Sequence, residues 1–194
     1  MARDRGRNPA PPGLAAVMPV EIGGIVPAGG QQGRGQPTMV ICTIPGYGAL
    51  HLEHCVSDFS GTLSEDGRLF PGVRERIERL SEHLQCHILT ADTHGRAAQE
   101  LEGLDCLVKF LVSDDHTGEK RRYVEDLGAR SVFAIGNGNN DTGMLRAARI
   151  GVAVCLAEGC SGETAAAADI LVRSPLDALD LLLKINRLIA TLRR

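Results

Sequence analysis

Strand-like and helix-like segments alternate along residues 39–194, and this alternation constrains the fold more than any other feature. The strand-like runs are apolar and bounded by glycine, proline or polar residues. They cover 39–44, 49–57, 87–90, 105–112, 132–135, 151–155 and 170–172. Apolar spacing and capping signals predict helices over 71–84, 94–102, 118–128, 141–149 and 174–192. Such alternation implies an α/β fold: a three-layer, Rossmann-like, mostly parallel sheet with helices on both faces.

The sequence also predicts the structure at the two ends of residues 39–194. The turn Pro45-Gly46-Tyr47-Gly48 joins the first two strands into an N-terminal β-hairpin. His51 and His54 fall on opposite faces of its second strand, so we expect two exposed histidines rather than a metal site. The leucine-rich helix at the C-terminal end is expected to pack in the core, and self-association into a homo-oligomer is the alternative.

Residues 1–38 differ in composition from the rest. They hold eight of the 23 glycines and six of the nine prolines, and they show no sustained apolar period. Such a segment buries too little apolar surface to offset the entropy of ordering, so we predict a disordered tail. A mis-assigned start is the alternative, because Met39 stands where the ordered pattern begins.

Residues 39–194 have the size of a single domain with a proper core. No segment approaches the roughly 18 apolar residues of a membrane span, so we expect no membrane partner. This part is acidic and lacks basic runs and aromatic platforms, which argues against a nucleic-acid partner. The six cysteines form no CxxC pair and lie mostly in apolar runs. We therefore expect reduced thiols and a cytoplasmic location.

Polar residues follow three of the predicted strands. Asp58 ends the second strand, Thr90 ends the third, and Asn137 follows the strand 132–135. In a parallel sheet, ligands bind outside the carboxyl ends of the strands. The three side chains are therefore expected to face one crevice.

Four segments form the candidate site. The first is Asp58-Phe59-Ser60-Gly61-Thr62-Leu63, and the second is Thr90-Ala91-Asp92-Thr93. The third is Lys120, at the start of a predicted helix. The fourth is Gly136-Asn137-Gly138-Asn139-Asn140-Asp141, a glycine-rich turn whose oxygen-bearing side chains suit a hard cation. Each is weak alone, but together they are unlikely to be accidental.

In order and spacing these segments resemble the haloacid-dehalogenase (HAD) superfamily of aspartyl-phosphate enzymes. More closely, they resemble the phosphorylation domain of P-type ATPases, whose Asp-Lys-Thr-Gly-Thr-Leu matches residues 58–63 at four of six positions. Gly-Asp-Gly-x-Asn-Asp of that group is similar to residues 136–141, and Ala-Ala-Asp-Ile-Val is similar to 167–171. Since the chain lacks membrane helices and a nucleotide-binding insertion, it resembles the soluble P-type ATPase-like group.

The resemblance implies a set of roles. Asp58 would be the nucleophile, Lys120 would offset charge on the phosphoryl group, and Thr90 would hold phosphate oxygens. Substrate contacts would come from Ser60, Gly61, Thr90, Ala91 and Asn140. Mg²⁺ would be the cofactor, held by Asp58, Asn137, Asp141 and the backbone carbonyl of Ser60.

Two positions depart from the family pattern. Phosphatases of the superfamily usually carry a second Asp where this chain has Ser60, and a metal-binding Asp where it has Asn137. A serine hydroxyl cannot replace a general acid–base near neutral pH, which typically forfeits 10²–10⁴-fold in rate. An amide oxygen still binds Mg²⁺ but carries no charge. The chain is therefore expected to turn over slowly.

The intervals between the motifs leave no room for a cap domain. From Asp58 to Thr90, and again from Thr90 to Lys120, the sequence has space for little more than one helix and a short strand or turn. The open site suits a macromolecular phosphate, or one shielded by another subunit. The expected partner is a phosphorylated small molecule, a nucleotide or a protein. We expect a Mg²⁺-dependent hydrolase of a phosphate monoester or ATP. The alternative is a weak or inactive regulatory protein that senses phosphate or nucleotide.

Overall fold

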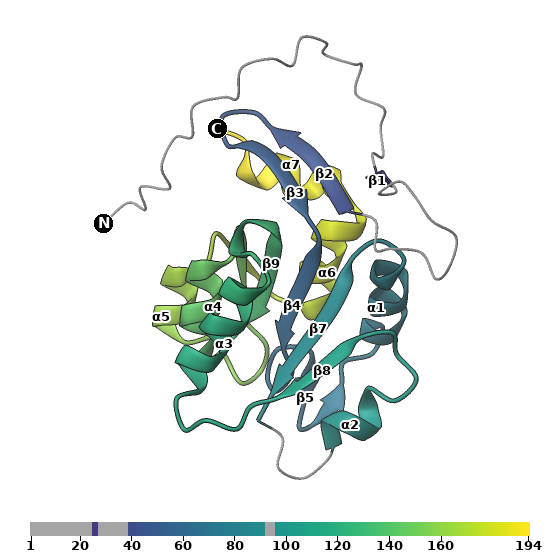
Figure 1. The fold of residues 1–194 in the computed structure, drawn as a ribbon, viewed down its shortest axis with the longest axis vertical. Coiled ribbons are helices and arrows are strands. Elements are labelled where there is room, and N and C mark those ends of the chain that lie inside the picture. The colour runs from purple at the N-terminus through teal and green to yellow at the C-terminus, as the bar shows by residue number, and fades with distance from the viewer. Residues whose placement is uncertain (1–24, 27–38, 92–95) are drawn as a thin grey trace.

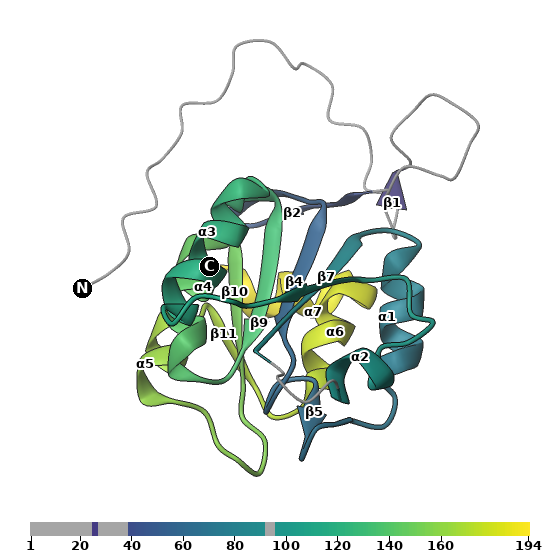
Figure 2. The same ribbon diagram turned by 60° about the horizontal axis from the view of Figure 1, so that its bottom comes forward.

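The computed structural model describes Ile25–Val26 and residues 39–91 and 96–194. A six-stranded sheet lies at the centre, in the order β11-β10-β9-β4-β7-β8, with every neighbouring pair parallel (Figures 1 and 2). Its strands are β4 (His54–Asp58), β7 (Gln85–Thr90), β8 (Leu107–Phe110), β9 (Val132–Gly136), β10 (Ile150–Val154) and β11 (Ile170–Val172). The predicted α/β fold is confirmed.

Helices cover both faces of this sheet (Figures 1 and 2). One face carries α3 (His116–Asp126), α4 (Thr142–Ala147) and α5 (Gly162–Ala167), and the other carries α1 (Val73–Ser81) and α6 (Pro175–Leu183). Successive strand residues serve opposite faces. On β4, for example, Cys55 joins the core under α1 and α6, and Val56 joins the core under α3 and α4. The three layers are therefore built by simple strand alternation.

The shorter elements lie between these layers. A small hairpin of β5 (Ser64–Glu65) and β6 (Arg68–Leu69) precedes α1, and α2 (Arg96–Glu100) lies between β7 and β8. Two 3₁₀ turns, η1 (Ala129–Ser131) and η2 (Asn139–Asp141), flank β9. The described residues of the intervals Asp58–Thr90 and Thr90–Lys120 hold no separate domain. The fold is capless, as predicted.

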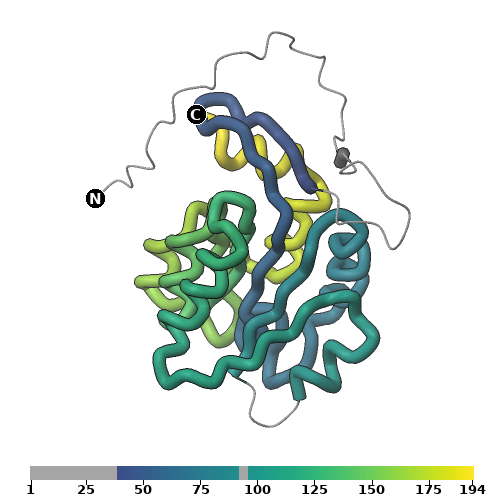
Figure 3. The backbone as a smooth tube through the Cα atoms, in the orientation of Figure 1, coloured from purple at the N-terminus to yellow at the C-terminus, as the bar shows by residue number. Residues whose placement is uncertain are grey.

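The predicted N-terminal hairpin is present, but its second strand is shorter than expected. β2 (Met39–Ile44) pairs antiparallel with β3 (Gly48–Leu52), and the chain then changes partners at Glu53. Glu53 N donates to Ser131 O at 2.9 Å, and Gln85 N donates to Glu53 O at 2.9 Å. The single strand predicted over 49–57 is thus wrong: the path is nearly continuous in Figure 3, but it belongs to two sheets.

The C-terminal region also differs from the prediction. The single helix expected from Ser174 towards Leu192 is two helices, because Lys184 leaves helical geometry (φ −128°, ψ 67°) between α6 and α7 (Ile185–Leu192). The predicted cap is confirmed, since Ser174 Oγ accepts from Leu176 N at 3.1 Å. Both helices contribute to the core, and α7 packs against α6 and β2. The short α5 and the β5–β6 pairing had not been predicted.

The predicted tail falls mostly outside the described residues. Ile25 and Val26 form the short strand β1, which pairs antiparallel with Val40 and Met39 of β2. The disordered tail expected over residues 1–38 stays a prediction. Across the described part of the chain, no helix is both long and apolar enough to cross a bilayer.

Candidate active site

Asp58 is the last residue of β4, the strand between β7 and β9 in the centre of the sheet. It is only 7% exposed. The following loop curls back on Phe59, whose carbonyl accepts from Leu63 N at 3.0 Å, Ser64 N at 3.0 Å and Ser64 Oγ at 2.9 Å. This turn fixes the backbone that carries Ser60, Gly61 and Thr62 directly after the carboxylate.

Lys120 reaches Asp58 from α3, the helix packed over β4 and β9. Its side chain is fully buried, and its Nζ lies 2.6 Å from Asp58 Oδ1 and 2.7 Å from Asp141 Oδ1. A buried ammonium is costly unless carboxylates compensate it. Two carboxylates, one from the end of β4 and one from η2, therefore meet at one lysine, which brings together three of the predicted site residues.

The pKa values of Asp58 and Lys120 reflect this crowding. Burial, and then the nearby carboxylate of Asp141, raise the pKa of Asp58 to about 7, although Lys120 and Thr62 oppose the shift. Burial alone would lower the pKa of Lys120, but Asp58 and Asp141 together raise it above its ordinary value. Lys120 therefore stays charged, while Asp58 ionises near neutral pH unless more positive charge enters the site.

The loop after β9 places Asn137 near Asp58, with the Thr62 hydroxyl between them. Asn137 N and Gly138 N each donate to Asp141 Oδ2 at 2.9 Å, so Asp141 holds the loop with one oxygen and Lys120 with the other. A Cβ on Gly136 would stand 2.5 Å from Asp141 Cβ, so this close turn requires glycine. The Asp141 carboxylate thus has partners in this loop, and its predicted role as a metal ligand stays a prediction.

The hydroxyl of Thr62 joins the two sides of the site. Thr62 Oγ1 lies 2.9 Å from Asn137 Oδ1 and 3.1 Å from Asp58 Oδ2. A hydroxyl has one hydrogen to donate, so two oxygen acceptors converge on a single donor. Convergent carboxylate and amide oxygens are the hard donors that suit Mg²⁺. Asp58 and Asn137 therefore fit a divalent cation that keeps several water ligands, with fewer carboxylates than usual.

Other predicted residues lie next to this centre. In the pairing of β4 with β7, Asp58 is opposite Leu89, so Thr90 stands one residue beyond it at the same sheet edge. Thr90 is buried, Ala91 is exposed, and Asn140 is half-buried in η2. The substrate-binding roles of Thr90, Ala91, Ser60, Gly61 and Asn140 stay predictions. Asp92 and Thr93 lie outside the described residues.

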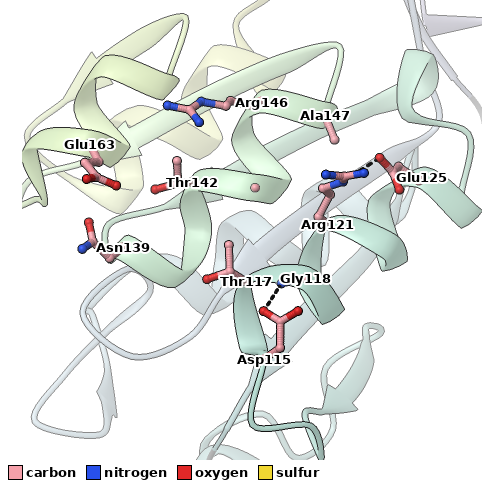
Figure 4. A pocket seen from close by; sticks show the side chains of 11 residues that line it. Asp115, Thr117, Gly118, Arg121, Glu125, Asn139, Thr142, Arg146, Ala147 and Glu163 are labelled. Carbon is pink, nitrogen blue, oxygen red and sulfur yellow. Dashed lines mark hydrogen bonds and ion pairs between the residues drawn. The ribbon is translucent and has the colours of Figure 1, made fainter.

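A surface hollow of about 730 Å³ lies between α3, α4 and α5 (Figure 4). Asp115, Thr117, Gly118, Arg121, Glu125, Asn139, Thr142, Gly143, Arg146, Ala147 and Glu163 line it. Asp58, Lys120 and Thr90 are not part of its lining. The hollow does not contain Asp58 and Lys120, the predicted catalytic residues, so we place the candidate site at the strand ends.

One side chain near the site had not been predicted. Glu158 lies in the turn after β10, and its Oε2 stands 2.7 Å from the position that a Cβ on Gly61 would take. Asn137 Nδ2 is 2.5 Å from the same point. The sequence carries little signal for this, since a Glu-Gly turn is common and 97 positions separate Glu158 from Gly61.

Solved structures with similar folds belong to the HAD superfamily. One, assigned to HAD subfamily III A in Legionella pneumophila, aligns with a TM-score of 0.59 and 16% identity over 72% of this chain and 86% of its own. The cobalt-bound deoxy-D-mannose-octulosonate 8-phosphate phosphatase of Haemophilus influenzae gives 0.58 and 14% identity, over 74% and 94%. The 3-deoxy-D-manno-octulosonate 8-phosphate phosphatase of Moraxella catarrhalis, with magnesium, phosphate and its sugar, gives 0.57 and 18%, over 73% and 94%. These likenesses define the fold as HAD-like.

Sequence comparison identifies a relative. No protein-family model matches the chain. The uncharacterized protein MJ0073 of Methanocaldococcus jannaschii is 48% identical over 64 residues, which is 33% of this chain and 69% of that protein. The chain therefore belongs to the family of MJ0073.

Proposed function

We propose that this protein is a divalent-cation-dependent phosphatase that forms an aspartyl-phosphate on Asp58. The observation that carries the proposal is the buried Lys120 ammonium, 2.6 Å from Asp58 and 2.7 Å from Asp141 at the carboxyl edge of a HAD-like sheet. Burying these charges is costly, so the arrangement calls for a purpose other than stability. Within this fold, we assign the chain to the soluble P-type ATPase-like group on the motif at residues 58–63.

The first chemical step follows from the position of Asp58. A carboxylate oxygen of Asp58 forms a bond to phosphorus while the bond from phosphorus to the leaving oxygen breaks. Lys120 Nζ stabilises the charge that spreads over the transferring phosphoryl group. Mg²⁺, held by Asp58, Asn137 and the Ser60 carbonyl, would offset the repulsion between the carboxylate and the phosphate dianion.

The second step is expected to be slow. Water must attack phosphorus, release inorganic phosphate and regenerate Asp58. Ser60 stands where a carboxylate would accept the proton of that water and donate one to the leaving oxygen, so bulk solvent must serve both needs. We therefore propose a long-lived phosphoenzyme and low turnover.

Two general features of the chain, the missing cap domain and the unpaired cysteines, support a proposal for its substrate and cellular location. The capless fold leaves the strand ends without a covering domain in the described residues, which suits a phosphate monoester or ATP carried by a small molecule, nucleotide or protein. All six cysteines are unpaired, which fits a reducing compartment such as the cytoplasm.

Phosphoenzyme trapping tests this function. Wild-type protein and Asp58→Asn are incubated with Mg²⁺ and either ³²P-labelled phosphate donors or beryllofluoride. We expect acid-stable label and phosphate release from the wild type alone. Equal labelling and equal phosphate release from both proteins would rule out Asp58 as the nucleophile.

A second function is favoured by Ser60 and Asn137, the two positions that lack carboxylates. A regulatory protein that senses phosphate or nucleotide needs the binding residues but not rapid turnover. It predicts calorimetric binding of phosphate analogues by the wild type without phosphate release. Ser60→Asp separates the two functions: a gain of 10²–10⁴-fold in hydrolysis shows that the remaining catalytic residues are competent. No gain, together with binding, favours the sensor.

A further inference from the structure

The loops that carry Ser60, Asn137 and Glu158 meet at Gly61. Gly61 has a positive φ of 71°, and its missing side chain leaves the space next to Asn137 Nδ2 and Glu158 Oε2. Any larger residue would be strained and would press on both groups. Gly61 thus allows a third acidic side chain to approach the loop that follows the nucleophile.

Hydrogen bonds attach the segment that carries Glu158 to the Asn137 loop. Gly159 N donates to Leu156 O at 2.9 Å and closes the turn, with Glu158 at its tip. Ser161 N then donates to Asn137 O at 2.9 Å. Thr164 Oγ1 donates to Gly138 O at 2.6 Å, so the two loops are joined at successive residues. The position of the Glu158 backbone is therefore set by the same contacts that place Asn137.

The negative charge of Glu158 would help to bind a divalent cation beside Asp58 and Asn137. Among the described residues, no group of three His, Cys, Asp or Glu side chains is arranged to hold a metal. Asp141, the other nearby carboxylate, gives its oxygens to Lys120 and to backbone N–H groups. Asp58, which contacts Lys120 and Thr62, is the carboxylate on the Asn137 side of the Thr62 hydroxyl, and a divalent cation prefers more than one charged ligand. Glu158 is exposed, so its long side chain has the freedom to turn towards a cation.

We propose that Glu158 supplies the second carboxylate of the cation site beside Asp58 and Asn137, in place of the charge that this chain lacks at residues 60 and 137. The proposal rests on the proposed function in assuming a divalent cation beside Asp58. It adds a ligand from the loop after β10, and it explains why that loop, the Asn137 loop and Gly61 pack together. The cation would be held by three loops at once.

Calorimetric titration of the full chain with MnCl₂, without substrate, tests the proposal. Glu158→Gln is expected to weaken Mn²⁺ affinity by about tenfold or more. Glu78→Gln makes the same charge change on an exposed position of α1 and is expected to bind as the wild type does. Equal affinities for the wild type and Glu158→Gln would overturn the proposal, as would a wild type that binds no Mn²⁺. Trapping on Asp58 decides the proposed function separately.

A double-mutant cycle distinguishes a ligand from a residue that only orients the Asn137 amide. Asn137→Asp replaces the amide with two equivalent oxygens, so its orientation no longer matters. If Glu158 binds the cation, Glu158→Gln still lowers Mn²⁺ affinity about tenfold in the Asn137→Asp background. If the second substitution has no effect there, Glu158 is not a ligand. Unchanged urea midpoints in all variants show that the fold is intact.

Discussion

Two clusters of buried or half-buried polar side chains lie on the same structural elements and offset the cost of burial in different ways. The charged cluster, Asp58, Lys120 and Asp141, lies at the carboxyl end of β4. The neutral cluster, His54, His87 and Tyr123, lies at its amino end, about 13 Å away at ~3.3 Å per residue. Each draws on β4 and α3, with Lys120 and Tyr123 on one side of the helix.

The neutral cluster is closed by its own hydrogen bonds. His54 Nδ1 lies 3.1 Å from His87 Nε2, and His87 Nδ1 lies 2.8 Å from Tyr123 Oη. Burial, and then the neighbouring His54, lower the pKa of His87 to about 4. Neutral tautomers satisfy these contacts without any added ion. The expectation that His54 is an exposed hairpin residue is therefore wrong, although His51 is exposed.

The charged cluster is not closed in the same way. It sets two carboxylates against one ammonium, and burial pushes the pKa of Asp58 up to about 7. The contrast teaches that burial alone does not mark a functional site in this fold. What distinguishes the charged cluster is that two carboxylates face one ammonium, and three measurements test that difference.

The largest expected effect is on the charged cluster. Lys120→Met leaves two buried carboxylates without a counter-ion, so the free energy of unfolding at pH 8 should fall by about 3–5 kcal/mol. Urea unfolding measures it. Lys109→Met removes a half-exposed partner 3.7 Å from Glu119 and should cost at most about 1 kcal/mol. Similar losses in the two variants would show that the buried ammonium is not needed for stability.

A smaller effect concerns the pH dependence of the neutral cluster. Because the pKa of His87 is lowered from 6.5 to about 4, the unfolded chain binds more protons between these values. Stability from this group is fully present above pH 6.5 and falls by about 3 kcal/mol as the pH drops to 4. Asp58 contributes with the opposite sign.

Comparing His87→Asn with the wild type cancels the contribution of Asp58. The urea midpoint of the wild type should fall more steeply with decreasing pH than that of the variant. Parallel curves would mean that His87 carries the same proton in the folded and unfolded chains.

The smallest effect is the loss of one hydrogen bond. Tyr123→Phe leaves His87 Nδ1 without its partner and should lower the free energy of unfolding by about 1 kcal/mol. Tyr47→Phe is the control, since the Tyr47 hydroxyl lies 3.4 Å from Arg149 O and is only partly buried. An equal or greater loss at Tyr47 would contradict a special role for the neutral cluster.

The sequence alone predicted those features of the fold and site that depend on residues close together in the chain. Asp58, Thr90 and Asn137 were predicted at strand ends because apolar runs precede them, and parallel pairing brings those ends to one edge. The Ser174 cap was likewise readable from Ser-Pro at a helix start. The contact of Lys120 with Asp58 came from a resemblance in motif order, since 62 positions separate them.

Other features depend on partners that a local pattern does not reveal. Glu53 looks like any strand residue, yet its backbone bonds to Gln85 and Ser131 end one pairing and begin another. Lys184 interrupts a leucine pattern that continues on both sides. Glu158 approaches Gly61 only because three loops pack together. For Glu53 and Glu158 the deciding contacts lie far away in the chain.

The change of partners at Glu53 also bears on synthesis of the chain. β4 follows directly from a hairpin whose two strands are close in sequence, so the hairpin can form as soon as it emerges from the ribosome. The edge of β4 that pairs with β9 stays open until residues 132–136 have been made. During that interval the chain presents an apolar strand edge, which is the kind of surface through which nascent proteins aggregate or meet chaperones.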